Sequence, residues 1–121
     1  MNQEQMIDLL RERTLKICEL SLEVSKRGLA QAFVSLFGNT KAMSADVQPI
    51  DAVHREDSAL PRPGKLAEVD ILFYFYDFHS QQEQEEHFRE QLTEADQYIA
   101  YLQLLLAQDK PIKMAAMRGV A

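Results

Sequence analysis

The first 28 residues carry apolar side chains at helical spacing. The positions that define this stripe follow one another at steps of three, four or seven residues: Met6, Leu10, Ile17, Leu20 and Val24. Such spacing places them on one face of a helix, which we expect to run from about Gln3 to Arg27. Gly28 can take the left-handed conformation that ends a helix, with Leu29 folding back onto the last turn.

The next segment alternates between apolar and polar residues and contains a turn sequence. Ala32–Phe37 predicts one β-strand, and the Gly-Asn-Thr triplet at 38–40 predicts the turn, because Gly and Asn tolerate positive φ. Lys41–Gln48 predicts the second strand, which Pro49 ends because proline cannot donate a hydrogen bond to a sheet. We therefore expect a β-hairpin here.

Residues 69–78, VDILFYFYDF, form a strongly apolar stretch that has two different faces at a period of two. One face is wholly apolar, with Val69, Ile71, Phe73 and Phe75. The other is mostly aromatic, with Leu72, Tyr74, Tyr76 and Phe78. Aromatic and β-branched residues favour a strand over a helix. We therefore expect a third strand over Glu68–Phe78, whose second face also contacts another surface.

A long helix is predicted directly after this strand. Ser80 and Glu83 form the capping box S-Q-Q-E, which predicts a helix that begins at Gln81. Apolar residues then follow at steps of four and three: Phe88, Leu92, Ala95, Ile99, Leu102 and Leu106. The helix should reach Gln108, before Pro111. A second capping box, T-E-A-D, leaves a break at Thr93 as an alternative.

The predicted elements follow the order α-β-β-β-α. The simplest arrangement is a two-layer α+β fold, in which a three-stranded antiparallel meander has both helices on one face. Either Phe33 and Phe37 or Val34 and Leu36 would then face the helices. We expect a single domain over 1–109, a mobile loop at 51–65 and a C-terminal tail at 110–121. The loop combines charges, prolines and a glycine without any periodicity.

The net charge of −6 is unevenly distributed along the 121 residues. Residues 68–109 contain ten acidic side chains and one basic one, Arg89, whereas acids and bases balance over 1–67. Such an acidic region repels phosphates, so we expect no nucleic-acid partner. No apolar run has the length of a membrane span, so we expect no membrane partner. The single cysteine, Cys18, and the charged first residues favour a cytoplasmic location.

Four residues around the start of the second helix could in principle share a divalent metal ion: Asp77, His79, Glu83 and His87. Glu83 and His87 share a helix face, but the set matches no known ligand spacing. The sequence contains no hydrolase nucleophile motif, phosphate-binding loop or dinucleotide fingerprint. We expect a non-enzymatic protein without a cofactor. A metal-binding protein or metal-dependent enzyme is the alternative.

The aromatic strand face is the other candidate site. Tyrosine offers a large contact area at low entropic cost and is favoured at protein interfaces. We expect Leu72, Tyr74 and Tyr76, with Tyr98 and Tyr101 of the second helix, to contact a protein partner or a second copy in a homodimer. In the alternative, a helix covers this face and the tyrosines line the core. Base stacking on the tyrosines is disfavoured by the local negative charge.

The hairpin AFVSLFGNTKAMSADVQPI resembles that of small uncharacterised proteins of bacterial phages and prophages. Those proteins also place a helix before the hairpin, then a strand and an acidic helix. The likeness implies a mobile-element origin but no activity. The chain is also similar to the small acidic dimeric chaperones of type III secretion, which open α-β-β-β-α, and a chaperone-like role is a further alternative. Residues 110–121 are too few for that family's last strand pair and third helix.

Overall fold

The computed structural model describes residues 1–52 and 64–114. Its elements are helix α1 (Gln3–Lys26), strands β1 (Gln31–Phe37), β2 (Ala42–Gln48) and β3 (Ala67–Leu72), and helix α2 (Gln81–Gln108). This confirms the α+β class and the α-β-β-β-α order. The predicted mobile loop at 51–65 falls mostly on residues 53–63, and the predicted tail mostly on 115–121. Both stretches lie outside the described residues.

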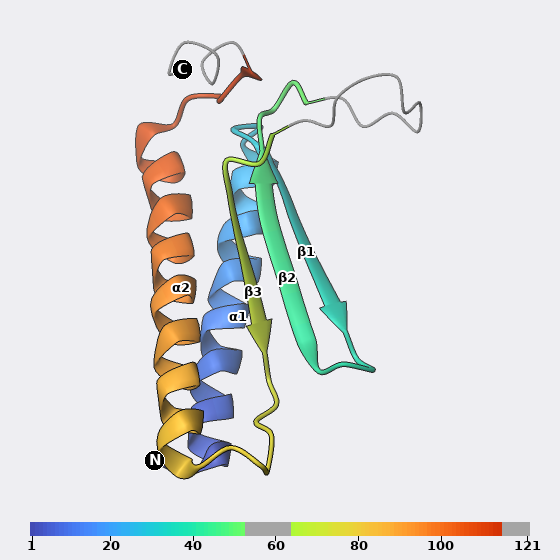
Figure 1. Ribbon diagram of the computed structural model, residues 1–121. Helices are drawn as coiled ribbons and strands as arrows, with labels where there is room; N and C mark the ends of the chain where they lie inside the picture. The colour runs from blue at the N-terminus through green and yellow to red at the C-terminus, as the bar shows by residue number, and fades with distance from the viewer. Residues whose placement is uncertain (53–63, 115–121) are drawn as a thin grey trace.

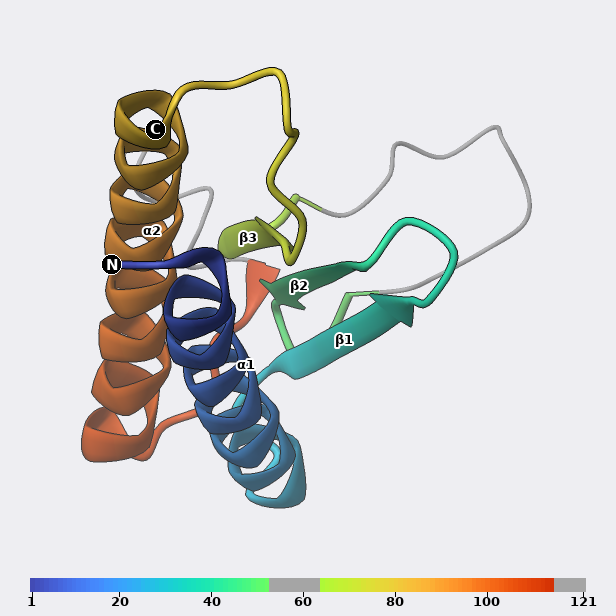
Figure 2. The same ribbon diagram turned by 90° about the horizontal axis from the view of Figure 1, so that it is seen from below.

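The three strands form one antiparallel sheet in the order β1-β2-β3, and both helices lie on the same side of it (Figure 1). Helix α1 packs on β1, α2 packs on β3, and the two helices pack against each other. The sheet edge formed by β1 therefore lies on the side of the molecule away from α2 (Figure 2). This is the predicted two-layer meander.

The core lies between the sheet and the helix pair. Its fully enclosed side chains come from all the layers: Met6, Leu10, Ile17 and Val24 of α1, Met43 and Val47 of β2, Ile71 of β3, and Leu102 and Leu105 of α2. These residues include most of the apolar stripe predicted for α1. The helical periodicity therefore identified the buried face of the first helix correctly.

The strand register decides which side chains of β1 face the helices. Val34 lies opposite Ala45 of β2, and Ala45 lies opposite Val69 of β3. Ala45 and Val69 are buried, so Val34 and Leu36 are on the helix side of the sheet. Of the two sequence alternatives, this pair is the correct one, although the end of β1 leaves Leu36 69% exposed.

Phe33 and Phe37 belong to the opposite face of the sheet, which no described helix covers. On the same face, the register places Asp46 of β2 beside Glu68 of β3, with Asp70 two residues further along β3. This face is therefore uncharged along β1 and acidic toward β3. The sequence did not decide which face of the sheet the helices cover. Because they cover the other face, Phe37, Asp46 and Glu68 remain on the side without a described helix.

Gly28 terminates α1 as predicted, two residues after the last helical residue, Lys26. Gly28 has a φ of +67°, in the left-handed region. The N–H of Leu29 donates to the carbonyl of Val24 at 3.2 Å, and the N–H of Gly28 donates to that of Ser25 at 3.1 Å. This pair of bonds is the Schellman motif, which satisfies carbonyls that the last helical turn leaves open.

Both helices begin with a capping box. In α1 the box joins Asn2 and Gln5, which was not predicted, and in α2 it joins the predicted Ser80 and Glu83. Helix α2 continues through Thr93 without a break, so the second capping-box sequence is not used. An N-cap residue needs an extended backbone, and the apolar stripe on both sides of Thr93 keeps the helix intact.

The third strand is shorter than predicted: it ends at Leu72, not at Phe78. The reason is that its partner strand ends there. Ala42, the first residue of β2, lies opposite Leu72, and the last bond across the pair runs from the N–H of Phe73 to the carbonyl of Lys41 at 2.8 Å. Beyond that point the neighbouring chain turns into the β1–β2 hairpin loop, so the residues after Phe73 have no strand to pair with. In this turn Lys41 has the positive φ (+52°), rather than Gly38 or Asn39 as predicted.

The chain after α2 starts as a packed segment rather than a free tail. The N–H of Ile112 donates to the carbonyl of Leu29, and its carbonyl accepts from the N–H of Ile50, both at 2.8 Å. The N–H of Met114 donates to the carboxylate of Asp51 at 2.8 Å. Because Ile112 also packs against the core, the first residues of the predicted tail are held against the rest of the fold.

Candidate functional site

Three exposed aromatic side chains follow the end of β3 and form the aromatic cluster: Tyr74, Tyr76 and Phe78. They are 39%, 45% and 78% exposed. The rings of Tyr74 and Tyr76 meet edge to face at 5.3 Å between centroids, and those of Tyr76 and Phe78 stack at 5.2 Å. The ammonium group of Lys41 lies 5.6 Å from the centre of the Tyr74 ring, within the range of a cation–π contact.

The cluster keeps the alternation predicted for a strand, although the backbone here is not paired with another strand. Phe75, between the two tyrosines, is 3% exposed and packs into the core. Its ring meets that of His87 edge to face at 6.3 Å. The inward position of Phe75 therefore orients its neighbours Tyr74 and Tyr76 outward.

Two buried glutamines of α2 hold this segment in place. The side chain of Gln91 bonds both backbone groups of Leu72: its Oε1 accepts from the N–H at 2.5 Å and its Nε2 donates to the carbonyl at 3.2 Å. The Nε2 of Gln84 donates to the carbonyls of Tyr76 and His79, each at 3.2 Å. An amide side chain has both donors and an acceptor, so these glutamines replace the missing neighbour strand.

Neither glutamine was identified from the sequence as a positioning residue. The signal was present, because Gln84 and Gln91 extend the apolar stripe of α2 at steps of four and three from Phe88. Both are 6% exposed. A polar residue at a core position of an amphipathic helix needs a buried hydrogen-bond partner, and a nearby unpaired backbone supplies one.

The five residues predicted for the interface do not form one surface. Leu72 is half-buried at the end of β3, and Tyr74 and Tyr76 are exposed beside it. Tyr98 is 3% exposed and belongs to the core. Tyr101 is half-buried and packs against the core. Burial raises the pKa of Tyr98 and of Tyr101, and the negative charge of Asp46 adds to the shift at Tyr98.

The candidate metal ligands take other contacts. The carboxylate of Glu83 accepts from the N–H of Ser80 in the capping box. The His79 ring lies 4.5 Å from Phe78, the His87 ring contacts Phe75, and Asp77 is exposed. Within residues 1–52 and 64–114, no group of three or more histidine, cysteine, aspartate or glutamate side chains is arranged to hold a metal ion.

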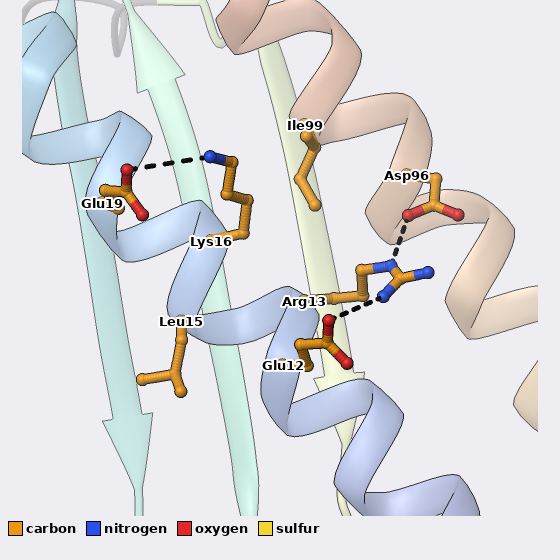
Figure 3. A pocket seen from close by; sticks show the side chains of 7 residues that line it. All are labelled: Glu12, Arg13, Leu15, Lys16, Glu19, Asp96 and Ile99. Carbon is orange, nitrogen blue, oxygen red and sulfur yellow. Dashed lines mark hydrogen bonds and ion pairs between the residues drawn. The ribbon is translucent and has the colours of Figure 1, made fainter.

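A shallow groove lies between the outer sides of α1 and α2 (Figure 3). It is lined by Glu12, Arg13, Leu15, Lys16, Glu19, Asp96 and Ile99. Its charges pair with one another, since Arg13 bonds Asp96 at 2.8 Å and Lys16 lies 3.7 Å from Glu19. The lining contains no histidine or cysteine, so it offers no neutral-pH base or thiol nucleophile.

The described residues thus provide an exposed aromatic surface, held by hydrogen bonds from Gln84 and Gln91, rather than a pocket with convergent chemistry. No helix in the described part of the chain is long and apolar enough to cross a membrane. Comparison with known proteins finds no matching family model, no matching curated protein and no matching solved structure.

Proposed function

We propose that this protein is a small non-enzymatic interaction module, a homodimer whose aromatic cluster contacts a partner protein. The observation that carries the proposal is that Tyr74, Tyr76 and Phe78 are exposed next to one another. The side chain of Gln84 holds their segment through a hydrogen bond to the carbonyl of Tyr76. Contiguous exposed aromatic side chains on a rigid support are typical of protein-binding surfaces. Rigidity matters because it lowers the entropy lost on binding.

The cluster is better suited to a protein than to nucleic acid. Asp77 lies within it and the acidic first turns of α2 follow it, and these charges oppose a phosphate backbone. The partner surface should therefore be apolar with basic residues at its rim. A cytoplasmic location, supported by the single half-buried Cys18, and the mobile-element origin implied by the hairpin resemblance are parts of the same proposal.

The test compares three forms of the protein as bait in a cell extract: wild type, Tyr74→Lys with Tyr76→Lys, and the control Gln97→Lys. Gln97 is exposed on α2, so the control adds a lysine outside the cluster. A protein retained by wild type and control but lost with the double variant supports the proposal. Identical sets of bound proteins from all three forms, together with unchanged molar mass, would contradict it.

A further inference from the structure

We propose that two copies of the chain join along the outer edges of β1, antiparallel about a two-fold axis. Their sheets then form one continuous six-stranded sheet with all four helices on one side. This inference rests on the proposed homodimer and names its contact surface. It leaves the aromatic cluster available for a different protein.

The two edges of the sheet differ in how they are protected. At the β3 edge, Gln91 bonds the backbone of Leu72, and the acidic Glu68 and Asp70 lie on the strand. Charged side chains and covering groups are the usual means by which proteins block pairing at an edge. The seven residues of β1, QAFVSLF, include no charged residue and no proline, and no described strand pairs with its outer edge. Among the residues that the structure describes, the β1 edge is thus the less protected of the two and the more open to another strand.

The sequence of β1 is complementary to itself when two copies run antiparallel. With Val34 opposite its own copy, Ala32 of each strand lies opposite Leu36 of the other. All three are on the helix side of the sheet in both copies, because side chains alternate along a strand and opposed residues share a face. The pairing would cover Leu36, which a single chain leaves 69% exposed.

Helix α1 adds a matching apolar stripe above this edge. Leu15 and Leu22 are 60% and 73% exposed and lie seven residues apart, on the same side of the helix. Leu15 points away from α2 (Figure 3), and α1 is the helix that packs on β1. In a two-fold assembly through β1, the stripes of the two α1 helices would face each other across the junction.

The charge distribution is compatible with a second copy at this edge, because two copies would meet there with little repulsion. Residues 1–52, which form α1, β1 and β2, carry seven acidic and six basic side chains. Residues 64–114, which include β3 and α2, carry ten acidic and four basic ones. Two identical acidic proteins repel each other least when their near-neutral halves meet and their acidic halves point apart. The β1 edge lies on the near-neutral half.

The first test measures molar mass by light scattering across a dilution series. Wild type and the control Leu104→Lys, a 49% exposed position on α2, should both give twice the 13.9 kDa of one chain. Leu22→Lys with Leu36→Lys should give a single-chain mass with an unchanged circular dichroism spectrum. A monomeric wild type would overturn both this inference and the homodimer of the proposed function. A folded double variant that stays dimeric would overturn this inference alone.

A second test needs no disruption of the fold. In a Cys18→Ser background, single cysteines at Ser35, Tyr76 and Leu104, all exposed positions, are treated with a short bis-maleimide linker. We expect a cross-linked dimer with Ser35→Cys, since this residue lies next to the proposed two-fold axis, and none with Leu104→Cys. Cross-linking through Tyr76→Cys and not through Ser35→Cys would place the dimer contact at the aromatic cluster and exclude pairing through β1.

Discussion

At the scale of single residues, Gly28 shows how one backbone conformation ends α1. Its φ of +67° costs a residue with a Cβ about 1 kcal/mol. Among the described residues, no heavy atom lies within 4 Å of the place a Cβ would take, so conformation alone sets the cost. We expect Gly28→Ala to lower the free energy of unfolding by about 1 kcal/mol in urea denaturation.

Gly38 is the matched control for this prediction. A Cβ there would also meet no atom within 4 Å, and its φ lies outside the left-handed region. Gly38→Ala should therefore leave the free energy of unfolding within about 0.5 kcal/mol of wild type, or raise it through a lower entropy of the unfolded chain. Equal losses at both glycines would mean that left-handed geometry is not what Gly28 provides.

Tyr98 has a hydroxyl group that is buried without a hydrogen-bond partner among the described residues. Burying an unpaired hydroxyl costs free energy that a phenylalanine would not lose. We expect Tyr98→Phe to leave the free energy of unfolding unchanged at neutral pH or to raise it by about 1 kcal/mol. A loss of stability larger than the experimental error, measured by thermal unfolding, would mean that the hydroxyl makes a favourable contact.

The same tyrosine predicts a dependence on alkaline pH. Burial raises the pKa of Tyr98 in the folded protein, whereas the pKa of a tyrosine in the unfolded chain is about 10. Above that value the unfolded state loses the proton while the folded state keeps it, so stability falls as the pH rises. Wild type should therefore lose stability more steeply than Tyr98→Phe above about pH 10. Parallel unfolding curves for the two proteins over this range would contradict the prediction.

Sequence patterns identified some of these residues and not others. The left-handed conformation of Gly28 was predictable because it depends only on local sequence: a glycine directly after the last helical turn commonly ends the helix in this conformation. The burial of Tyr98 was not predictable, because Tyr98 and the half-buried Tyr101 both belong to the apolar side of α2. Which of the two tyrosines enters the core depends on where the sheet lies relative to α2. The periodicity of the helix alone does not contain that information.

At the scale of elements, the end of β3 depends on α2. Gln91 satisfies both backbone groups of Leu72 from a position that is 6% exposed. In Gln91→Leu a side chain of similar size would leave the part-buried N–H and carbonyl of Leu72 unpaired. We expect this change to lower the free energy of unfolding by about 2 kcal/mol in urea denaturation.

The control for Gln91 is Gln97→Leu on the same helix. Gln97 is exposed, so its replacement should change the free energy of unfolding by less than about 0.5 kcal/mol. Amide hydrogen exchange adds a local readout, because Gln91→Leu should accelerate exchange at Leu72 and leave the centre of β2 protected. A similar effect of both substitutions would assign the loss to helix propensity and not to the bonds with β3.

The helices and the hairpin were predictable because their signals lie within each element. Periodicity and the Ser80 capping box predicted α2 with the bounds that the structure has. The length of β3 was not predictable from its own residues. A strand lasts only as long as its partner, and β2 begins at Ala42, so the strongly β-forming residues after Leu72 have no strand to pair with. The segment instead binds side chains of α2.

At the scale of the whole molecule, the first and last elements share the core. Helix α1 packs against α2, and the Nε of Arg13 bonds the carboxylate of Asp96 across the pair at 2.8 Å. Without α2, the buried face of α1 and the end of β3 would both be open to water. We expect a fragment of residues 1–79 to lack a cooperative unfolding transition by circular dichroism. A cooperative transition in that fragment would show that α1 and the sheet are sufficient for folding.

The layer arrangement was predictable from the order of elements, but the surface was not. Two helices and three strands in this order leave few compact topologies. The exposed positions of Leu15, Leu22 and Leu36 depend on how far each helix shifts over the sheet. That shift is set by the packing of both helices against each other. The exposure of these leucines near the β1 edge was therefore not predictable from the sequence.

The pairing of the first helix with the last has a consequence for biosynthesis. The ribosome releases α1 early, but its partner α2 is complete only roughly 80 residues later, a delay of several seconds at about 5–20 residues per second. During that time the nascent chain exposes the apolar face of α1 to water and to any chaperone at the tunnel exit. The moment at which this core closes is thus set by the release of α2, and slow translation of its codons would lengthen the exposure.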